Sequence, residues 1–105
     1  MTPLTIPDDA ILLGRHVQVP QHVVFRRFPT ETVMLNLHSG RYHGLNPIGG
    51  EMLAALAEGA SLHETANALA ERYCQPQAIL ERDICSLCGE LLQRGLIELD
   101  DRPAP

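Results

Sequence analysis

The hydrophobic periodicity of this chain changes once, at Asn46-Pro47, and this change sets the fold class that the sequence can adopt. Between residues 23 and 45, β-branched and aromatic residues cluster and apolar side chains alternate with other residues, which is the period of strands. After Pro47, apolar residues recur every three or four positions, which is the period of amphipathic helices. The sequence therefore predicts strands followed by helices, the order of an α+β domain.

Three strands are predicted in the first half, at residues 23–28, 32–37 and 41–45. On the second strand Val33, Leu35 and Leu37 share one face, because side chains two residues apart point the same way. The connections are short, and Gly40 can supply the positive φ that a tight turn needs. The strands are therefore expected to form a three-stranded antiparallel sheet, with a second turn of either two residues or a bulged form.

Three helices are predicted in the second half: one from Asn46-Pro47 to near Gly59, one over residues 61–73 and one over residues 77–94. Asn46 suits an N-cap, and Ser61 with Glu64 forms a capping box. Gly95 suits the left-handed position that ends a helix. One stripe of the third helix is apolar and is expected to face the core: Leu80, Ile84, Leu87 and Leu91. With a short wing at residues 97–99, the prediction is a small winged-helix-turn-helix domain, a three-stranded antiparallel sheet followed by three helices.

The ends of the chain are expected to lie outside this domain. The 105 residues suffice for one domain, which we place at residues 21–99. Residues 1–20 contain Pro3, Pro7, Gly14 and Pro20, so we expect an extended arm without a helix, with a short strand at residues 17–19. Residues 100–105 are acidic and rich in proline and are expected to form a flexible tail.

Composition excludes several classes of partner. The longest apolar run has six residues, far fewer than the roughly 20 of a membrane span, so no membrane partner is expected. The start of the chain lacks the features of an export signal, so a cytoplasmic location with reduced thiols is expected. Residues 1–45 carry four Arg and three acidic residues, net +1, whereas residues 51–105 carry four Arg and ten acidic residues, net −6. A formal net charge of −5 argues against a nucleic-acid partner, because phosphates are bound mainly through basic side chains.

No catalytic constellation is apparent in the sequence, so we expect neither an enzyme nor a cofactor. The chain has no Lys, which excludes a Schiff-base or P-loop lysine, and its five His are dispersed. Cys85 and Cys88 have CxxC spacing, but they fall in the middle of a predicted helix and lack a second ligand pair for zinc. Packing is the favoured role for these thiols, and a zinc site completed by Cys74 is the alternative. A winged-helix DNA-binding regulator is a further alternative, although the third helix carries a net charge of −1 where DNA recognition favours basic residues.

The third strand offers a different kind of site. It is the last of the meander, so one of its edges can be unpaired, and an unpaired edge can accept a strand from another chain. Main-chain hydrogen bonds would then provide affinity, and pockets beside the edge would select side chains. An edge covered by the N-terminal arm is the alternative.

Residues 35–49 resemble a known family. They match the pattern L-x-L-x-x-G-x-Y-x-x-L-N-x-x-G of PqqD-like proteins, and the similarity continues through residues 64–73 and 83–96. PqqD-like domains are the recognition elements of ribosomally synthesised, post-translationally modified peptides. The resemblance implies a winged-helix fold that holds the leader segment of a precursor peptide as an added strand. Where many relatives have Trp in the first helix, this chain has Met52-Leu53, a difference that bears on core filling.

The resemblance is strongest to the stand-alone leader-binding proteins of lasso-peptide biosynthesis. It implies three partners: the precursor peptide, a leader peptidase of the cysteine-protease type and a cyclase. PqqD itself, which presents a precursor to a radical SAM enzyme, is the alternative. The implied binding residues are Arg41, Tyr42, His43, Gly44 and Leu45 on the third strand and Leu80, Asp83, Ile84 and Leu87 on the third helix.

Several of these assignments leave alternatives open. Tyr42 and His43 point to opposite faces, and the ambiguous turn leaves open which one faces the ligand. Ile84 and Leu87 lie on the apolar stripe and can instead be buried in the core. Asp83 can accept a hydrogen bond or ion pair from the leader or can simply be solvated.

Overall fold

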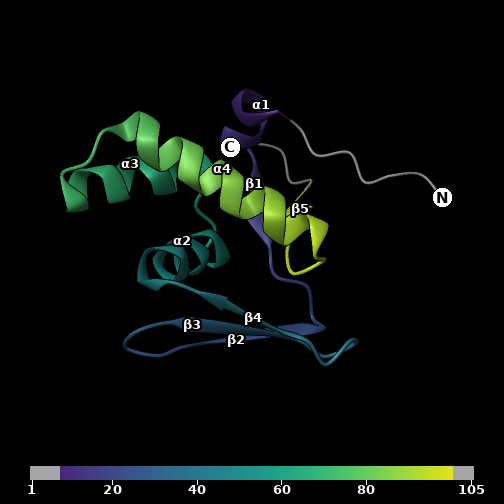
Figure 1. Ribbon diagram of the computed structural model, residues 1–105. Coiled ribbons are helices and arrows are strands. Elements are labelled where there is room, and N and C mark those ends of the chain that lie inside the picture. The colour runs from purple at the N-terminus through teal and green to yellow at the C-terminus, as the bar shows by residue number, and fades with distance from the viewer. Residues whose placement is uncertain (1–7, 101–105) are drawn as a thin grey trace.

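The computed structural model describes residues 8–100. The elements in chain order are α1 (Asp9–Leu13), β1 (His16–Gln18), β2 (Val23–Arg27), β3 (Thr32–Asn36), β4 (Tyr42–Leu45), α2 (Pro47–Ala57), α3 (Leu62–Tyr73), α4 (Gln77–Gln93) and β5 (Glu98–Asp100). The strands form two antiparallel sheets, β2-β3-β4 and β1-β5. Figure 1 shows the three-stranded sheet on one side of the molecule and α3 and α4 on the other. The predicted α+β class, with this sheet followed by three helices, is confirmed.

The turn between β3 and β4 has the bulged form. The Asn36 N–H donates to the Arg41 carbonyl (3.0 Å), and the Gly40 N–H donates to the Asn36 carbonyl (2.8 Å), so Gly40 and Arg41 together face one residue. Gly40 has φ of 74°, the left-handed conformation that this bulge requires. The remaining register pairs Tyr42 with Leu35 and His43 with Met34.

The two faces of this sheet differ in burial. Thr32, Met34 and Leu45 point to the inner face and are buried. Val33 and Leu35 share a face as predicted, but it is the outer one, where both are half-buried; Leu37 lies in the turn after the end of β3 and is 56% exposed. The alternation was therefore predicted, and the structure adds that the helices cover the opposite face.

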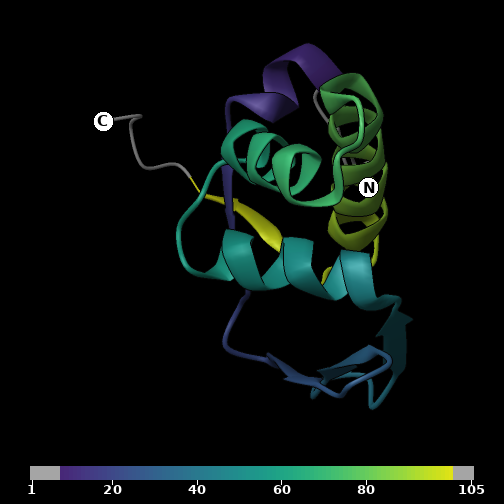
Figure 2. The ribbon, with the colours of Figure 1, turned by 90° about the vertical axis from the view of Figure 1, so that its left-hand side faces the viewer.

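Helix α2 lies between the three-stranded sheet and the remaining helices (Figure 2). Its N-cap is Asn46, whose Oδ1 accepts a hydrogen bond from the Gly49 N–H (2.7 Å), so the predicted start is confirmed. Met52, Leu53 and Leu56 are buried between the layers. Since Asn46 directly follows β4, this cap also fixes the end of that strand.

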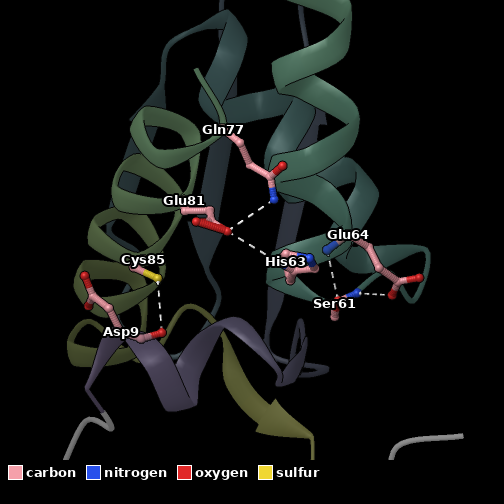
Figure 3. Close-up of polar contacts among 7 residues, drawn as sticks. All are labelled: Asp9, Ser61, His63, Glu64, Gln77, Glu81 and Cys85. Carbon is pink, nitrogen blue, oxygen red and sulfur yellow. Dashed lines mark hydrogen bonds and ion pairs between the residues drawn. The ribbon is translucent and has the colours of Figure 1, made fainter. Parts of the chain in front are cut away.

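Helices α3 and α4 pack against each other (Figure 3). Capping interactions and a glycine set where these helices begin and end. The predicted capping box is present: the Ser61 Oγ accepts from the Glu64 N–H (3.1 Å), and the Glu64 Oε1 accepts from the Ser61 N–H (2.9 Å). His63 Nδ1 lies 3.3 Å from the Glu81 Oε2, which joins the two helices. Helix α4 ends at Gln93 with Arg94 as its C-cap, and the next residue, Gly95, has φ of 70° and thus takes the predicted left-handed position.

The buried stripe of α4 differs from the prediction at one position. Leu80, Ile84 and Leu91 are buried as expected, whereas Leu87 is only half-buried. Cys88 takes the place of Leu87 in the core and is fully buried.

The N-terminal region corrects the prediction of an arm without a helix. Residues Asp9–Leu13 form α1, whose N-cap Asp8 accepts a hydrogen bond through its Oδ1 from the Ile11 N–H (3.2 Å). The expected strand near residues 17–19 is present as β1, and it pairs with β5, the expected wing. Residues 1–7 of the expected arm and 101–105 of the expected tail lie outside the described residues. Within residues 8–100, no helix has the length and apolar character needed to cross a bilayer.

Candidate functional site

Strand β4 is an edge strand. It pairs with β3 on one side, and among residues 8–100 no strand pairs with its other side. Strand β1, from the expected arm, pairs with β5 and so does not cover this edge. Within the described part of the chain, β4 therefore offers unpaired main-chain groups.

The hydrogen-bond pattern shows which groups these are. Bonded and non-bonded pairs alternate in an antiparallel ladder, so the bond between Asn36 and Arg41 puts His43 and Leu45 in bonded pairs with β3. Tyr42 and Gly44 fall in the non-bonded pairs. Their N–H and C=O groups consequently point away from β3, toward the unpaired edge, and could form up to four ladder bonds.

A cavity of about 520 Å³ lies at the beginning of β4. It is lined by Asn36, Ser39, Gly40, Arg41, Tyr42 and His43 from the sheet and by Arg94 and Leu96 from the end of α4 and the segment after it. His43 points to the inner face of the sheet, toward the helices, whereas Tyr42 points to the outer face and is 73% exposed. The register therefore places His43 on the face that the helices cover, although both side chains line this cavity.

A second cavity, of about 310 Å³, lies beyond the other end of β4. It is lined by Asn46, Ile48, Gly49 and Met52 around the start of α2 and by Asp83, Ser86, Leu87 and Glu90 of α4. The two cavities therefore lie along β4 and α4, which run in opposite directions. We call the two cavities with the intervening edge the β4–α4 cleft.

One stripe of α4 lines this cleft. Asp83, Leu87, Glu90 and Arg94 are spaced by four, three and four residues, so they share one face of the helix. This stripe lies beside the buried one, which explains why Leu87 is only half-buried. One stripe of α4 thus packs in the core, and the adjacent stripe lines the cleft.

Charges in the cleft are divided between its ends. Arg41 and Arg94 lie at the cavity near the start of β4, and Asp83 and Glu90 lie at the other cavity. Arg94 Nη2 is 3.3 Å from the Glu90 Oε1, so these two charges compensate each other. Arg41 and Asp83 form no ion pair with any residue in the described range 8–100.

The structure brings five of the predicted site residues to the lining of the cleft: Arg41, Tyr42, His43, Asp83 and Leu87. Gly44 is exposed on the edge itself. Leu45, Leu80 and Ile84 are at most 5% exposed and belong to the core. Their side chains therefore lie beneath the residues that line the cleft. The remaining lining residues were not predicted as site residues: Asn36, Ser39, Gly40, Asn46, Ile48, Gly49, Met52, Ser86, Glu90, Arg94 and Leu96. The helical spacing from Asp83 was a signal for two of these, Glu90 and Arg94.

The outer face of the sheet carries a further hollow of about 600 Å³. It is lined mostly by apolar side chains, with Val24, Phe25, Arg26, Phe28, Glu31, Val33, Leu35 and Tyr42 around it. Val24 and Phe28 are each about half exposed, at 47% and 50%. Tyr42 lines both this hollow and the cleft, so the two surfaces meet along β4.

The three cysteines are free thiols that differ in exposure. Cys74 is exposed at the end of α3, whereas Cys85 and Cys88 are buried in α4. Burial raises the pKa of Cys85 to about 11, with a further contribution from the negative charges of Asp9 and Glu81. Burial also raises the pKa of Cys88 to about 12. Within residues 8–100, no three His, Cys, Asp or Glu side chains are grouped so that they could hold a metal ion.

Comparisons with known proteins place the chain in a family. Residues 31–97 match the family model described as coenzyme PQQ synthesis protein D (PqqD). No curated protein matches the chain. Two solved structures are similar in fold, and both were determined as leader-peptide complexes.

The first of these structures is TbiB1 in complex with the TbiA(beta) leader peptide, with 26% identity and a TM-score of 0.71 over 83% of this chain and 99% of that one. The second is lasso peptide synthetase B1 complexed with the leader peptide, with 24% identity and a TM-score of 0.73 over 78% of this chain and 96% of that one. The resemblance to PqqD-like recognition elements noted in the sequence is thereby confirmed. This chain belongs to the PqqD family.

Proposed function

We propose that this protein is a non-catalytic recognition element that binds the leader region of a ribosomally synthesised precursor peptide. The leader adds to β4 as a fourth strand and lies in the β4–α4 cleft. The bound precursor is then presented to a leader peptidase of the cysteine-protease type, as in lasso-peptide maturation, and a cyclase completes the product.

The observation that carries this proposal is the unpaired edge of β4 beside a cleft. Tyr42 and Gly44 direct their main-chain groups into the space that an added strand would occupy. The cavities at the two ends of β4 lie where the side chains of such a strand would reach α4. Main-chain bonds are indifferent to the sequence of the guest, so the cavities would provide the selectivity.

The fold relatives favour the same ligand class. TbiB1 and the lasso peptide synthetase B1 were each solved with a leader peptide, and each is covered almost completely by its match to this chain. This likeness favours the lasso type of pathway. The match to the PqqD family model favours the second candidate, in which the precursor is presented to a radical SAM enzyme.

Presentation to an enzyme requires a second surface besides the leader cleft. The outer face of the sheet is suited to this role because it is apolar, exposed and continuous with β4 through Tyr42. An added leader strand would extend this face by its own alternate side chains. The peptidase could thus contact the recognition element and the leader at once.

Titration of the isotope-labelled protein with a synthetic leader peptide of its cognate precursor tests the proposal. Amide signals of residues 41–45 should shift and saturate at a 1:1 ratio, and the amides of Tyr42 and Gly44 should become protected from hydrogen exchange. Duplex DNA, added in a parallel titration, should leave these signals in place. Unchanged β4 signals at an excess of leader peptide would contradict strand addition, and saturable shifts with DNA would favour the regulator alternative.

A further inference from the structure

We propose that the β4–α4 cleft selects a peptide by its charge polarity: a basic residue toward its N-terminus and an acidic residue four positions later. This inference rests on the proposed function and specifies the chemistry of the ligand. It follows from the position of two charged side chains, Arg41 and Asp83, relative to the unpaired edge.

Arg41 and Asp83 mark opposite ends of the cleft. Arg41 lines the cavity at the start of β4, and Asp83 lines the cavity beyond its end. Neither forms an ion pair with another residue of the described range 8–100, unlike Arg94 and Glu90, which neutralise each other. The cleft therefore presents one uncompensated positive charge and one uncompensated negative charge to a ligand. Charges placed in this way select partners of complementary polarity.

The direction of the ligand follows from strand pairing. Antiparallel pairing is more stable per residue than parallel pairing, so we take the guest to run opposite to β4. Its N-terminal part then lies near Leu45 and Asp83, and its C-terminal part lies near Arg41. A basic side chain is consequently required at the N-terminal end and an acidic one at the C-terminal end.

The spacing follows from the register. Side chains of directly opposed residues lie on the same face, so guest residues opposite Leu45, His43 and Arg41 point inward to α4. These are positions i, i+2 and i+4 of the guest, which span about 13 Å. The central one lies opposite His43, which lines the same cavity as the apolar Leu96, and it therefore suits an apolar side chain. The predicted ligand pattern is thus basic, any, apolar, any, acidic.

Selection of peptides from an unbiased library tests this pattern. Random 12-residue peptides displayed on phage are selected on the immobilised full chain and sequenced. We expect enrichment of Lys or Arg at i, an apolar residue at i+2 and Asp or Glu at i+4. Enriched peptides without this polarity would overturn the charge rule and leave strand addition standing. A selection that enriches no peptide would overturn the proposed function and the charge rule together.

Exchanging the charges of the peptide and of the protein then tests whether Arg41 and Asp83 cause the preference for this polarity. The best selected peptide is compared with a version in which its basic and acidic residues are exchanged, so that composition is constant. Exposed ion pairs change Kd by up to about five-fold each, so the wild-type chain should favour the first peptide by about five- to twenty-fold. The Arg41→Glu/Asp83→Arg variant should reverse the order.

Arg82→Glu is the matched control, because Arg82 is exposed on the same helix but does not line the cleft. This variant should keep the wild-type ratio of Kd values. In 1 M NaCl the ratio should approach one, because salt screens exposed charges. Equal affinity of the wild-type chain for the two peptides at low salt, or an unchanged order in the doubly exchanged variant, would overturn the inference.

Discussion

Gly50 of α2 packs directly against Thr32 of β3. A Cβ atom on residue 50 would lie 3.0 Å from the Thr32 Cβ and closer still to the Thr32 hydroxyl oxygen. Thr32 is only 2% exposed and pairs with Leu45, the last residue of β4. This approach therefore sets the distance between α2 and the sheet, and with it the position of the edge strand.

Replacing Gly50 with Ala should destabilise the fold by about 1–3 kcal/mol, the usual cost of an extra methyl group in a packed interior. Gly89→Ala is the matched control, because it lies inside α4 with no atom within 4 Å of an added Cβ. That change should stabilise the protein by about 0.5–1 kcal/mol, because Ala favours the helix. Chemical denaturation measures both, and equal effects of the two substitutions would contradict the close contact.

Replacing Gly44 with Pro should weaken leader binding by at least about ten-fold. The Gly44 N–H points away from β3, so Pro removes a bond to the guest and leaves the β3 ladder intact. Calorimetric titration with the leader peptide measures the loss, and circular dichroism checks the fold.

Gly44→Ala is the control that separates two effects of the proline substitution: the loss of the backbone N–H and the loss of the backbone freedom of glycine. An added Cβ at this position would meet only the Glu31 Oε2, at 3.8 Å, which is ordinary contact, and the N–H is retained. Affinity should therefore stay within about two-fold of the wild type, since this change removes no hydrogen bond. If Gly44→Pro binds the leader as tightly as Gly44→Ala, β4 is not the site of strand addition.

Local patterns in the sequence predicted the elements well, because each depends on near neighbours. The N-cap at Asn46, the capping box at Ser61 and the end of α4 at Gly95 are set by side chains within a few residues. Alternation likewise located β3. It did not reveal that Thr32 and Met34, rather than Val33 and Leu35, face the core, because that choice depends on which face α2 covers.

Features that depend on distant contacts were less accessible from sequence. Helix α1 has only five residues and lies in a segment rich in proline and glycine, so composition hid it. The pairing of Val17 with Leu99 joins residues from opposite ends of the chain. In the candidate site, the resemblance pointed to Asp83 and Leu87, but Asn36 and Leu96 join the lining only because the end of α4 approaches the start of β4.

Protonation of Glu64 should remove part of the stability of α3. Hydrogen bonds from Ser61, first from its backbone N–H, lower the pKa of Glu64 below its ordinary value of 4.5. A carboxyl whose pKa is lower in the folded state stabilises the fold above the unfolded pKa, and loses this effect as the pH falls through the folded pKa. The difference in unfolding free energy between the wild type and Glu64→Gln should therefore be constant near pH 7 and shrink below about pH 4.5.

Ser61→Ala provides the companion measurement at neutral pH. It removes the hydroxyl that accepts from the Glu64 N–H and should cost about 1 kcal/mol. A pH-independent difference between the wild type and Glu64→Gln would show that the carboxylate charge does not stabilise the helix.

Only one of the three thiols should react rapidly in the native protein. Cys74 is exposed, whereas Cys85 and Cys88 are buried and have pKa values raised to about 11 and 12. Since the thiolate is the reactive form, Ellman's reagent at pH 8 should titrate one thiol quickly and all three after denaturation. The Cys74→Ser variant should lack the fast phase, and a fast phase that persists would contradict the burial of the two α4 thiols.

Polar substitutions on the outer face of the sheet should separate leader binding from leader removal. Val24 and Phe28 line the outer hollow and are half exposed, so Val24→Ser/Phe28→Ser should leave the fold and the cleft intact. We expect an unchanged Kd for the leader peptide but a rate of leader cleavage lowered by about ten-fold or more, because a docked apolar side chain contributes about 1.5–3 kcal/mol. Ile79→Ser, an exposed apolar position on α4 at 38%, is the control and should leave both quantities unchanged. Cleavage at the wild-type rate by the double variant would place the peptidase on another surface, whereas a parallel loss of leader affinity would show that the outer face supports the cleft and does not dock the enzyme.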